Sequence, residues 1–214
     1  MSELSAYDVL TTTRSVRKRL DLTRPVDLDV VRECLEIALQ APSGSNRQGW
    51  HFVVVTEPAL RAAIGGVYRR SVQDYLDSPG SAARLFADQP DRATVQHRVG
   101  DSVAHLGEHM GEAPVLVIPC VEVPGGELAA GTQAGLWGSV LPATWSFMLA
   151  LRLRGLVSAW TTLHLAYEQE VADLLGLPAH VRQAALLPVA HPIGDQFRRA
   201  ARAPLDQVLH VDRW

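Results

Sequence analysis

An uncharged stretch of 24 residues, from Leu128 to Leu151, constrains the fold of this chain more than any other feature. Its length meets the requirement of about 20 residues for a helix that spans a membrane. Glycine, serine, threonine, glutamine and proline residues interrupt it, however, and make it too polar for lipid on every face. From about Leu136 onward it is apolar on nearly every side, which is typical of a helix buried in a large core or against another chain. We therefore expect a loop followed by a buried helix, and no membrane span.

The length of 214 residues fits one domain, and neither an internal repeat nor a low-complexity linker divides the chain. We therefore treat residues 1–214 as a single domain. Its two cysteines, Cys34 and Cys120, fall in apolar runs where reduced, buried thiols are expected. The first residues include acids and no apolar core, unlike a signal peptide, so we expect a cytoplasmic protein. A net charge of −3 argues against nucleic acid as a partner.

Helical and strand patterns alternate along the chain, with long helices between short strands. The helices are expected at about residues 6–12, 27–41, 58–75, 92–111, 136–151 and 168–175, and the strands at 51–56, 114–121, 158–163 and 184–190. This order predicts an α+β fold in which helices cover a central sheet. The uncharged helix and the tail at residues 198–214 both lack a partner within the chain, and a symmetric dimer would supply one.

Two polar segments are candidates for ligand binding. Residues 13–19 place four cations and two hydroxyls just after the first helix, and there Arg14, Ser15 and Arg17 can offer guanidinium forks and a hydroxyl to one anion. A solvated basic turn is the alternative. Residues 42–50 are rich in small polar side chains and exposed amides that suit a planar heterocycle. An ordinary helix stop is the alternative there.

Other groups of polar residues in the sequence give weaker indications of a functional site. The acids and histidines of residues 101–112 have metal-ligand spacing, but most lie on the face of the helix opposite its apolar stripe, so we expect a solvated surface and no metal. His164 follows a predicted strand, where a structural role is expected. Neither a nucleophile elbow, a dinucleotide fingerprint nor a phosphate loop with lysine is present, which argues against hydrolases and nucleotide triphosphatases.

Taken in order, these segments resemble the FMN-dependent nitroreductase superfamily over nearly the whole chain. The segments that carry the resemblance are Arg14–Arg17, Arg24–Val26, Ala41–Asn46, Gln48–Val55, Trp160–Leu163, Leu187–Ala190 and Arg202–Val208. The resemblance implies a nitroreductase-like sheet covered by helices in an intertwined homodimer, with two FMN molecules at the subunit interface. It also implies that the tail, residues 198–214, extends over the partner subunit and that residues 77–111 form a variable lid.

The same resemblance assigns the cofactor contacts, and no side chain is assigned as catalytic. The positions that match FMN-binding residues of the family are Arg14, Ser15, Arg17, Ser43, Ser45, Asn46, Thr161, Thr162, Leu163 and Arg202, with Gln48 as a further candidate. Arg14 and Arg202 are expected at the phosphate and Arg17 at the pyrimidine edge, where a cation favours the reduced, anionic flavin. Two departures from the family pattern are Thr13, where an arginine is frequent, and Gly49, where proline is common.

The implied reaction is ping-pong transfer of hydride from NADH or NADPH through FMN to an electrophilic acceptor such as a nitroaromatic or a quinone. Three alternatives stay open. The protein could bind or store flavin with little turnover, could catalyse a sister reaction such as reductive dehalogenation or flavin breakdown, or could be an interaction protein without flavin.

Overall fold

The fold is built on an antiparallel sheet of six strands, seen in a computed structural model that describes residues 4–128, 130–131 and 133–214. The strands are β1 (Leu20–Asp21), β2 (Trp50–Val55), β3 (Val115–Glu122), β4 (Val157–Ser158), β5 (Val181–Gln183) and β6 (Leu187–Pro192). Their main order is β1-β6-β3-β2, with β4 on β6 and β5 on β3. Hydrogen bonds join β3 to β2, β5 and β6. The α+β architecture predicted from the sequence is therefore confirmed.

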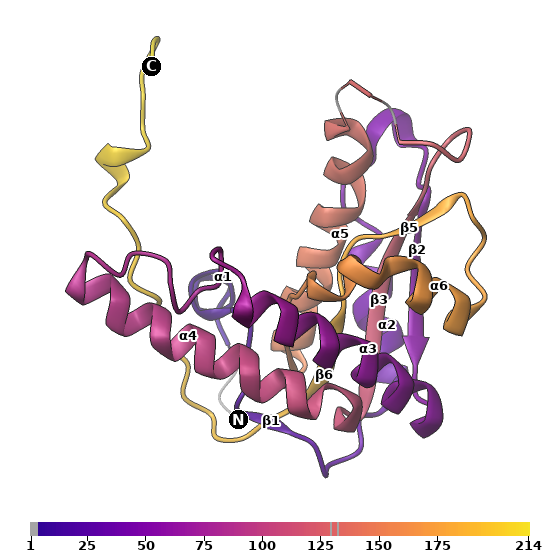
Figure 1. Ribbon diagram of the computed structural model, residues 1–214. Helices are drawn as coiled ribbons and strands as arrows, with labels where there is room; N and C mark the ends of the chain where they lie inside the picture. The colour runs from indigo at the N-terminus through magenta and orange to yellow at the C-terminus, as the bar shows by residue number, and fades with distance from the viewer. Residues whose placement is uncertain (1–3, 129, 132) are drawn as a thin grey trace.

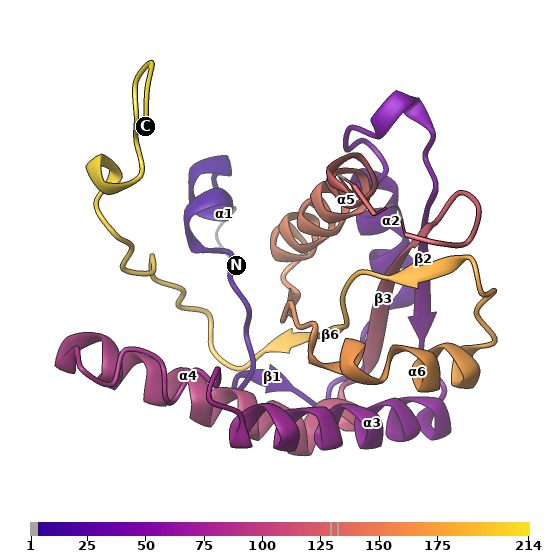
Figure 2. The same cartoon turned by 45° about the horizontal axis from the view of Figure 1, so that its top comes forward.

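Helices cover both faces of this sheet (Figure 1). The helices of the described residues are α1 (Ala6–Thr12), α2 (Leu28–Ala38), α3 (Pro58–Asp77), α4 (Pro90–His109), α5 (Ala134–Leu153) and α6 (Glu168–Leu175), with short 3-10 helices at Gly44–Asn46, Met110–Glu112, Leu163–Tyr167 and Leu205–Gln207. Helix α1 and the last 3-10 helix stand apart from the sheet (Figure 2). Helices α2 and α5 lie on one side, and α3 and α4 run along the other (Figure 2).

Strand β3 separates two hydrophobic cores. Leu116, Ile118 and Cys120 pack into the core that contains α3, α4 and α6, whereas Val115 and Val117 pack into the core that contains α2 and α5. Since successive side chains of a strand point to opposite faces, a strand covered on both sides must be apolar throughout. This requirement explains the unbroken apolar run that predicts β3.

The uncharged helix expected from the sequence is α5, and it is buried on one face only. Phe147 and Leu151 are fully buried against α2 and the sheet, but Trp145 and Leu153 are exposed. Among the described residues, α5 alone is long and apolar enough to pass a length-and-composition test for a membrane span, a test that core helices also pass. The burial expected for this helix is thus confirmed for one face, and its other face is open in the single chain.

Two of the predicted strands needed correction. The run 158–163 was expected as one strand, but only Val157–Ser158 pairs as β4, and the chain then turns into a 3-10 helix at Leu163–Tyr167. Thr161 still forms an isolated antiparallel bridge with Leu186, and its hydroxyl accepts from the Leu163 amide at 3.5 Å and lies 3.0 Å from the Tyr68 hydroxyl. Of the run 184–190, only residues 187–190 belong to a strand, as the first part of β6, because residues 184–186 lie in the connection between β5 and β6. The short strand β1 has no signal in the sequence.

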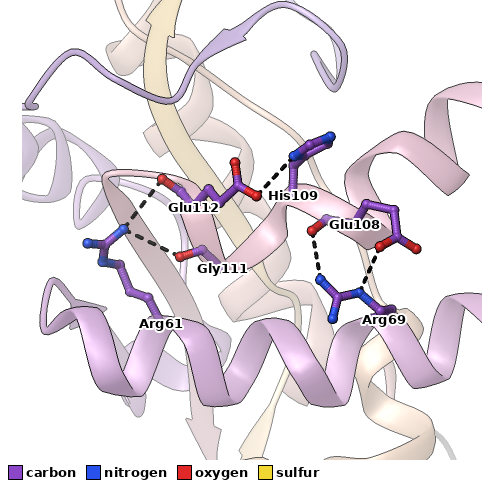
Figure 3. Close-up of polar contacts among 6 residues, drawn as sticks. All are labelled: Arg61, Arg69, Glu108, His109, Gly111 and Glu112. Carbon is purple, nitrogen blue, oxygen red and sulfur yellow. Dashed lines mark hydrogen bonds and ion pairs between the residues drawn. The ribbon is translucent and has the colours of Figure 1, made fainter.

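The charged residues near the end of α4 hold α4 against α3 (Figure 3). Arg69 pairs with Glu108 at 3.0 Å, and the His109 ring lies 3.1 Å from Glu112. The Arg61 guanidinium donates to the backbone carbonyls that follow α4, including that of Gly111 at 3.5 Å. Within the described part of the chain, histidines, cysteines and carboxylates form no group of three that could hold a metal ion.

Burial of His164 predicts a stability that depends on pH. Loss of solvation lowers the pKa of His164 to about 4, and Gln183 opposes this shift in part. The unfolded chain, with a histidine pKa near 6.5, binds the proton more tightly, so stability is complete above pH 6.5 and falls as the pH drops toward 4. Between pH 7 and pH 5 this group should cost about 2 kcal/mol of unfolding free energy.

Urea denaturation at the two pH values measures this effect. In a His164→Gln variant, the difference in unfolding free energy between pH 7 and pH 5 should be smaller than in the wild type by about that amount. His180 is exposed, so the control variant His180→Gln should show the same difference as the wild type. An unchanged pH profile in His164→Gln would contradict the prediction.

Candidate functional site

The arginine-rich loop after α1 is joined to the segment after β4, which lies about 145 residues further along the chain. The Trp160 amide donates to the Ser15 hydroxyl at 2.9 Å, and the Val16 amide donates to the Ser158 carbonyl at 2.9 Å. These bonds bring Arg14–Arg17 beside Thr161–Leu163, so the fold unites six of the predicted cofactor-binding positions. We refer to these two stretches together as the arginine half-site.

The two arginines of the half-site are held without counter-charges. The Nε atoms of Arg14 and Arg17 are buried and have no hydrogen-bond partner among the described residues. The structure also places no described carboxylate in an ion pair with either side chain. Burial lowers the pKa of Arg17, and the neighbouring hydroxyls of Tyr68 and Tyr75 oppose this shift. Because buried cations are normally paired, this arrangement suits an anionic ligand.

Some of the hydroxyls in this half-site have structural roles. The Ser15 hydroxyl joins the two segments, and the buried Thr161 hydroxyl is engaged with Tyr68. By contrast, Thr162 is exposed and Leu163 is half-buried, so their surfaces are open to a ligand. Tyr68 was not singled out in the sequence, because a tyrosine on an amphipathic helix carries no local signal of a contact 93 residues away.

The second predicted segment, residues 43–48, lies at the opposite end of α5. The Gly44 amide donates to Ser139 of α5 at 3.0 Å, and the Gln48 amide donates to the Ser43 hydroxyl at 2.8 Å. Ser45, Asn46 and Gln48 all have positive φ angles, of 53°, 52° and 52°. Three such non-glycine residues in one short loop store strain of a kind that clusters at ligand-binding sites. Ser45, Asn46 and Gln48 are also exposed.

The two groups of residues are not brought together within one chain. The 43–48 loop contacts Ser139, whereas Arg152, 13 residues further along α5, lines a cleft with Arg14. At 1.5 Å per residue, these positions are about 20 Å apart along the helix. Arg202 does not contact the arginine half-site either. It lies in the exposed tail, and among the described residues it donates a hydrogen bond only to the adjacent Ala201 carbonyl.

The tail begins next to the arginine half-site and then leaves the body of the protein. Phe197 lies between the guanidinium groups of Arg19 and Arg152, at 4.4 and 3.9 Å from its ring centroid. Beyond it the chain extends away from the fold, with every residue from Ala201 to Trp214 exposed (Figure 1). The sequence pattern does not predict a role for Arg152. An arginine in the last turn of an otherwise apolar helix can nevertheless indicate a charged group that the fold places in a cleft.

Comparison with known proteins identifies the fold family. The model of the nitroreductase family matches residues 10–194. The chain belongs to the nitroreductase family. This nitroreductase-family chain is 31% identical over 208 residues to an NADH dehydrogenase of Thermus thermophilus, with 92% of this chain and 90% of that protein aligned. It is 28% identical over 207 residues to iodotyrosine deiodinase 1 of Rattus norvegicus, covering 95% of this chain and 68% of that protein.

Solved structures of the nitroreductase family agree with this fold. A crystal structure of oxidized iodotyrosine deiodinase bound to FMN and 3-iodo-L-tyrosine superposes with a TM-score of 0.71 at 24% identity, covering 92% of this chain and 95% of that one. An FMN- and NADPH-dependent nitroreductase from sphigopyxis sp. strain HMH superposes with a TM-score of 0.72 at 23% identity, covering 99% of this chain and 100% of the other. These likenesses support the resemblance found in the sequence.

Proposed function

We propose that this protein is an FMN-dependent oxidoreductase that passes hydride from NADH or NADPH to a small electrophilic acceptor, such as a nitroaromatic or a quinone. The observation that carries the proposal is the arginine half-site. Its two half-buried arginines have buried Nε atoms and no described counter-charge, and it lies in a chain of the nitroreductase family. FMN carries a phosphate and a planar ring with a polar edge. The guanidinium groups and the hydroxyls of the half-site can donate hydrogen bonds to both.

We assign each residue of the half-site to a different part of FMN. Arg14 lies on the cleft shared with α5 and would hold the phosphate of FMN. Arg17 lies near Tyr68 and would meet the pyrimidine edge, where a fixed cation favours the anionic reduced form. Thr162 and Leu163 would cover one face of the ring. When bound, FMN supplies the hydride chemistry, and the residues of the chain position it and exclude water.

A second copy of the chain would complete the site. The 43–48 loop is about 20 Å from the arginine half-site along α5, so we propose that Ser43, Ser45 and Asn46 serve the FMN of the partner subunit in a homodimer. The exposed face of α5 would be buried at that interface. The tail carries several exposed apolar residues and would extend over the partner, bringing Arg202 to a phosphate there; these apolar residues are Leu205, Val208, Leu209, Val211 and Trp214.

The segment at residues 77–111 would form the lid of the substrate pocket. In the structure it comprises a turn-rich stretch and α4, whose N-terminal part projects beyond the sheet (Figure 2). The described residues of that projecting part are mostly exposed, including Leu85 and Val95. A projecting segment that exposes single apolar side chains among polar ones can close on a flat organic acceptor.

Reductive dehalogenation is a second candidate activity. It is supported by the 28% identity to iodotyrosine deiodinase 1 over 95% of this chain. Incubating the reduced protein with 3-iodotyrosine, and separately with a nitroaromatic compound, distinguishes the two reactions by their products. Released iodide indicates dehalogenation, and a hydroxylamine or amine indicates nitro reduction.

The visible spectrum of the purified protein tests the proposed function. We expect a yellow protein whose visible flavin absorption bleaches when NADH or NADPH is added under nitrogen, within about a second at a median enzyme turnover of about 10 per second. A yellow protein that neither donor bleaches would indicate flavin storage in place of turnover. A colourless protein that takes up no added FMN would contradict the proposal and favour an interaction protein.

A cytoplasmic location fits this function, because the reaction uses reduced nicotinamide donors. Cys34 and Cys120 are free and buried, and burial raises the pKa of these thiols to about 11 and about 12, which keeps them protonated and unreactive.

A further inference from the structure

A cleft lies at the end of the sheet where β2 ends and β3 begins, and it shares no lining residue with the arginine half-site. We call it the β2–β3 cleft. One wall is formed by the connection between β1 and α2, within residues 22–28, and the other by Thr56, Arg61 and residues 112–115. Its volume is about 340 Å³, within the range of roughly 300–1,000 Å³ that is typical of sites for small organic molecules. The cleft is therefore large enough to hold such a ligand.

Arg61 of α3 places a fixed cation in one wall. Its Nε donates to the Thr56 carbonyl at 3.1 Å, and its Nη1 donates to the carbonyls of Gly111, Glu112 and Ala113. These neutral acceptors hold the half-buried guanidinium in one orientation, while Nη2 has no described partner and is not buried. An arginine that is already ordered in this way loses little further entropy when it binds an anion.

The carboxylate of Glu112, which also lines the cleft, does not neutralise Arg61. Its Oε1 lies 3.1 Å from Nδ1 of His109, and Figure 3 shows the carboxylate turned toward that ring. Arg61 meets Glu112 through the backbone carbonyl alone. The Glu112 side chain is also 58% exposed, so solvent screens its charge. The positive charge of Arg61 thus has no described carboxylate in an ion pair with it.

Arg24 brings a second cation to the opposite wall. It is exposed, and the structure shows no ion pair between its guanidinium and a described carboxylate. The nearby carboxylate of Asp21 accepts from the Thr23 amide at 3.0 Å, the Thr23 hydroxyl at 2.8 Å and the Arg24 amide at 3.1 Å. Asp21 therefore fixes the turn that carries Arg24, and its oxygen is occupied by these donors.

Most of the remaining lining is apolar. It includes Leu22, Val26, Leu28, Pro114 and Val115. Val115 is 2% exposed and belongs to the core beneath α2 and α5, whereas Leu28 is 46% exposed. Apolar walls with a few placed polar groups are typical of sites that bind an organic molecule and fix its orientation. A ligand that matches this cleft combines an anionic group with an apolar body.

We propose that the β2–β3 cleft binds a small organic carboxylate, with its oxygens at Arg24 and Arg61 and its apolar body against Val115 and the neighbouring apolar residues. A carboxylate suits the cleft better than a phosphate, because Arg61 already uses Nε and Nη1 on backbone carbonyls and offers Nη2 to a single oxygen. The site contains none of the residues assigned to FMN, so it goes beyond the proposed function and does not depend on it.

A saturation-transfer NMR titration of the full-length protein tests this site, with phenylacetate as the probe and 2-phenylethanol as its uncharged analogue. We expect phenylacetate to bind with a dissociation constant of about 1 mM or below, an ordinary affinity for a ligand of about ten non-hydrogen atoms. The loss of charge-assisted hydrogen bonds should make 2-phenylethanol bind about tenfold more weakly or worse.

Arg24→Met should weaken phenylacetate binding by about tenfold or more, since it removes one charge-assisted contact from an exposed position. The matched control Arg32→Met removes an exposed arginine of α2 that does not line the cleft, and should bind phenylacetate as the wild type does. Arg61→Met should cause at least the same loss in a protein that urea denaturation shows to be folded. If Arg61→Met does not fold, the comparison of Arg24→Met with Arg32→Met decides.

The arginine half-site is the competing location for an organic carboxylate. The variant with Arg14→Ala and Arg17→Ala should keep the affinity for phenylacetate. Loss of binding there together with wild-type affinity in Arg24→Met would overturn the inference, as would a wild type that binds no phenylacetate at about 10 mM or binds 2-phenylethanol equally well. A protein that takes up no flavin, yet binds phenylacetate through Arg24, would refute the proposed function and keep the β2–β3 cleft as a binding site.

Discussion

Replacing Arg14 and Arg17 together with alanine is expected to abolish the retention of FMN. Both side chains are half-buried, and neither forms an ion pair with a described carboxylate, so their charge is available to an anionic ligand. Hydrogen bonds to charged groups are worth about 1.5–3 kcal/mol each, so the double change should weaken FMN binding by about 100-fold or more. The flavin-to-protein ratio after gel filtration, read from the visible spectrum, measures the effect.

A second double variant controls for the loss of two arginines as such. Arg32 on α2 is exposed, and Arg154 pairs with Glu33 at the surface, so Arg32→Ala with Arg154→Ala lowers the net charge equally without touching the half-site. This control should keep its full flavin content. Full flavin content in the Arg14→Ala, Arg17→Ala protein would show that the half-site is assigned wrongly.

The largest effect on stability is expected from Gly65→Ala. Gly65 lies where α3 crosses the 3-10 helix at Met110–Glu112, and a Cβ atom there would come within 2.6 Å of the Gly111 nitrogen and 2.7 Å of the Gly111 Cα. Both atoms belong to the backbone, so the two helices must move apart. Overpacking of this kind typically costs 1–3 kcal/mol, and we expect about 3 kcal/mol because backbone has to shift.

The neighbouring glycine provides a matched control. A Cβ at Gly66 would meet no atom within 4 Å. Gly66→Ala should therefore stabilise α3 by about 0.5–1 kcal/mol through helix propensity alone. Urea denaturation of Gly65→Ala and Gly66→Ala measures the unfolding free energy when a methyl group is added at a crowded position and at the open position next to it. Equal effects of the two substitutions would rule out the tight crossing.

Much of the secondary structure follows from local chemistry. Asp27 caps α2, and its side chain accepts from the Asp29 amide. Pro58 begins α3, and Gly176 ends α6 with a left-handed φ of 64°. Such signals depend on atoms within a few residues, so the sequence contains them directly.

The strand predicted at 158–163 forms only in part, and the reason is a long-range contact that no local signal in the sequence reveals. Its apolar and β-branched residues favour an extended chain, and Thr161 still bridges Leu186 through the backbone, but the side chain of Thr161 contacts Tyr68 of α3 and the chain then enters the 3-10 helix at Leu163–Tyr167. A contact between residues 93 positions apart leaves no periodic trace in the sequence. For the same reason the sequence offered no sign of β1, which exists because β6 lies beside it.

The sequence by itself determined the family to which this chain is similar, and it predicts which residues bind a phosphorylated heterocycle and that an uncharged helix packs against a partner. The tertiary structure decided where those residues meet. It joined Ser15 to Trp160, separated the 43–48 loop from the arginines, and buried Arg152 beside Arg14. The physical reason is that donor chemistry belongs to each side chain, whereas burial and the absence of a counter-charge arise only when distant segments pack together.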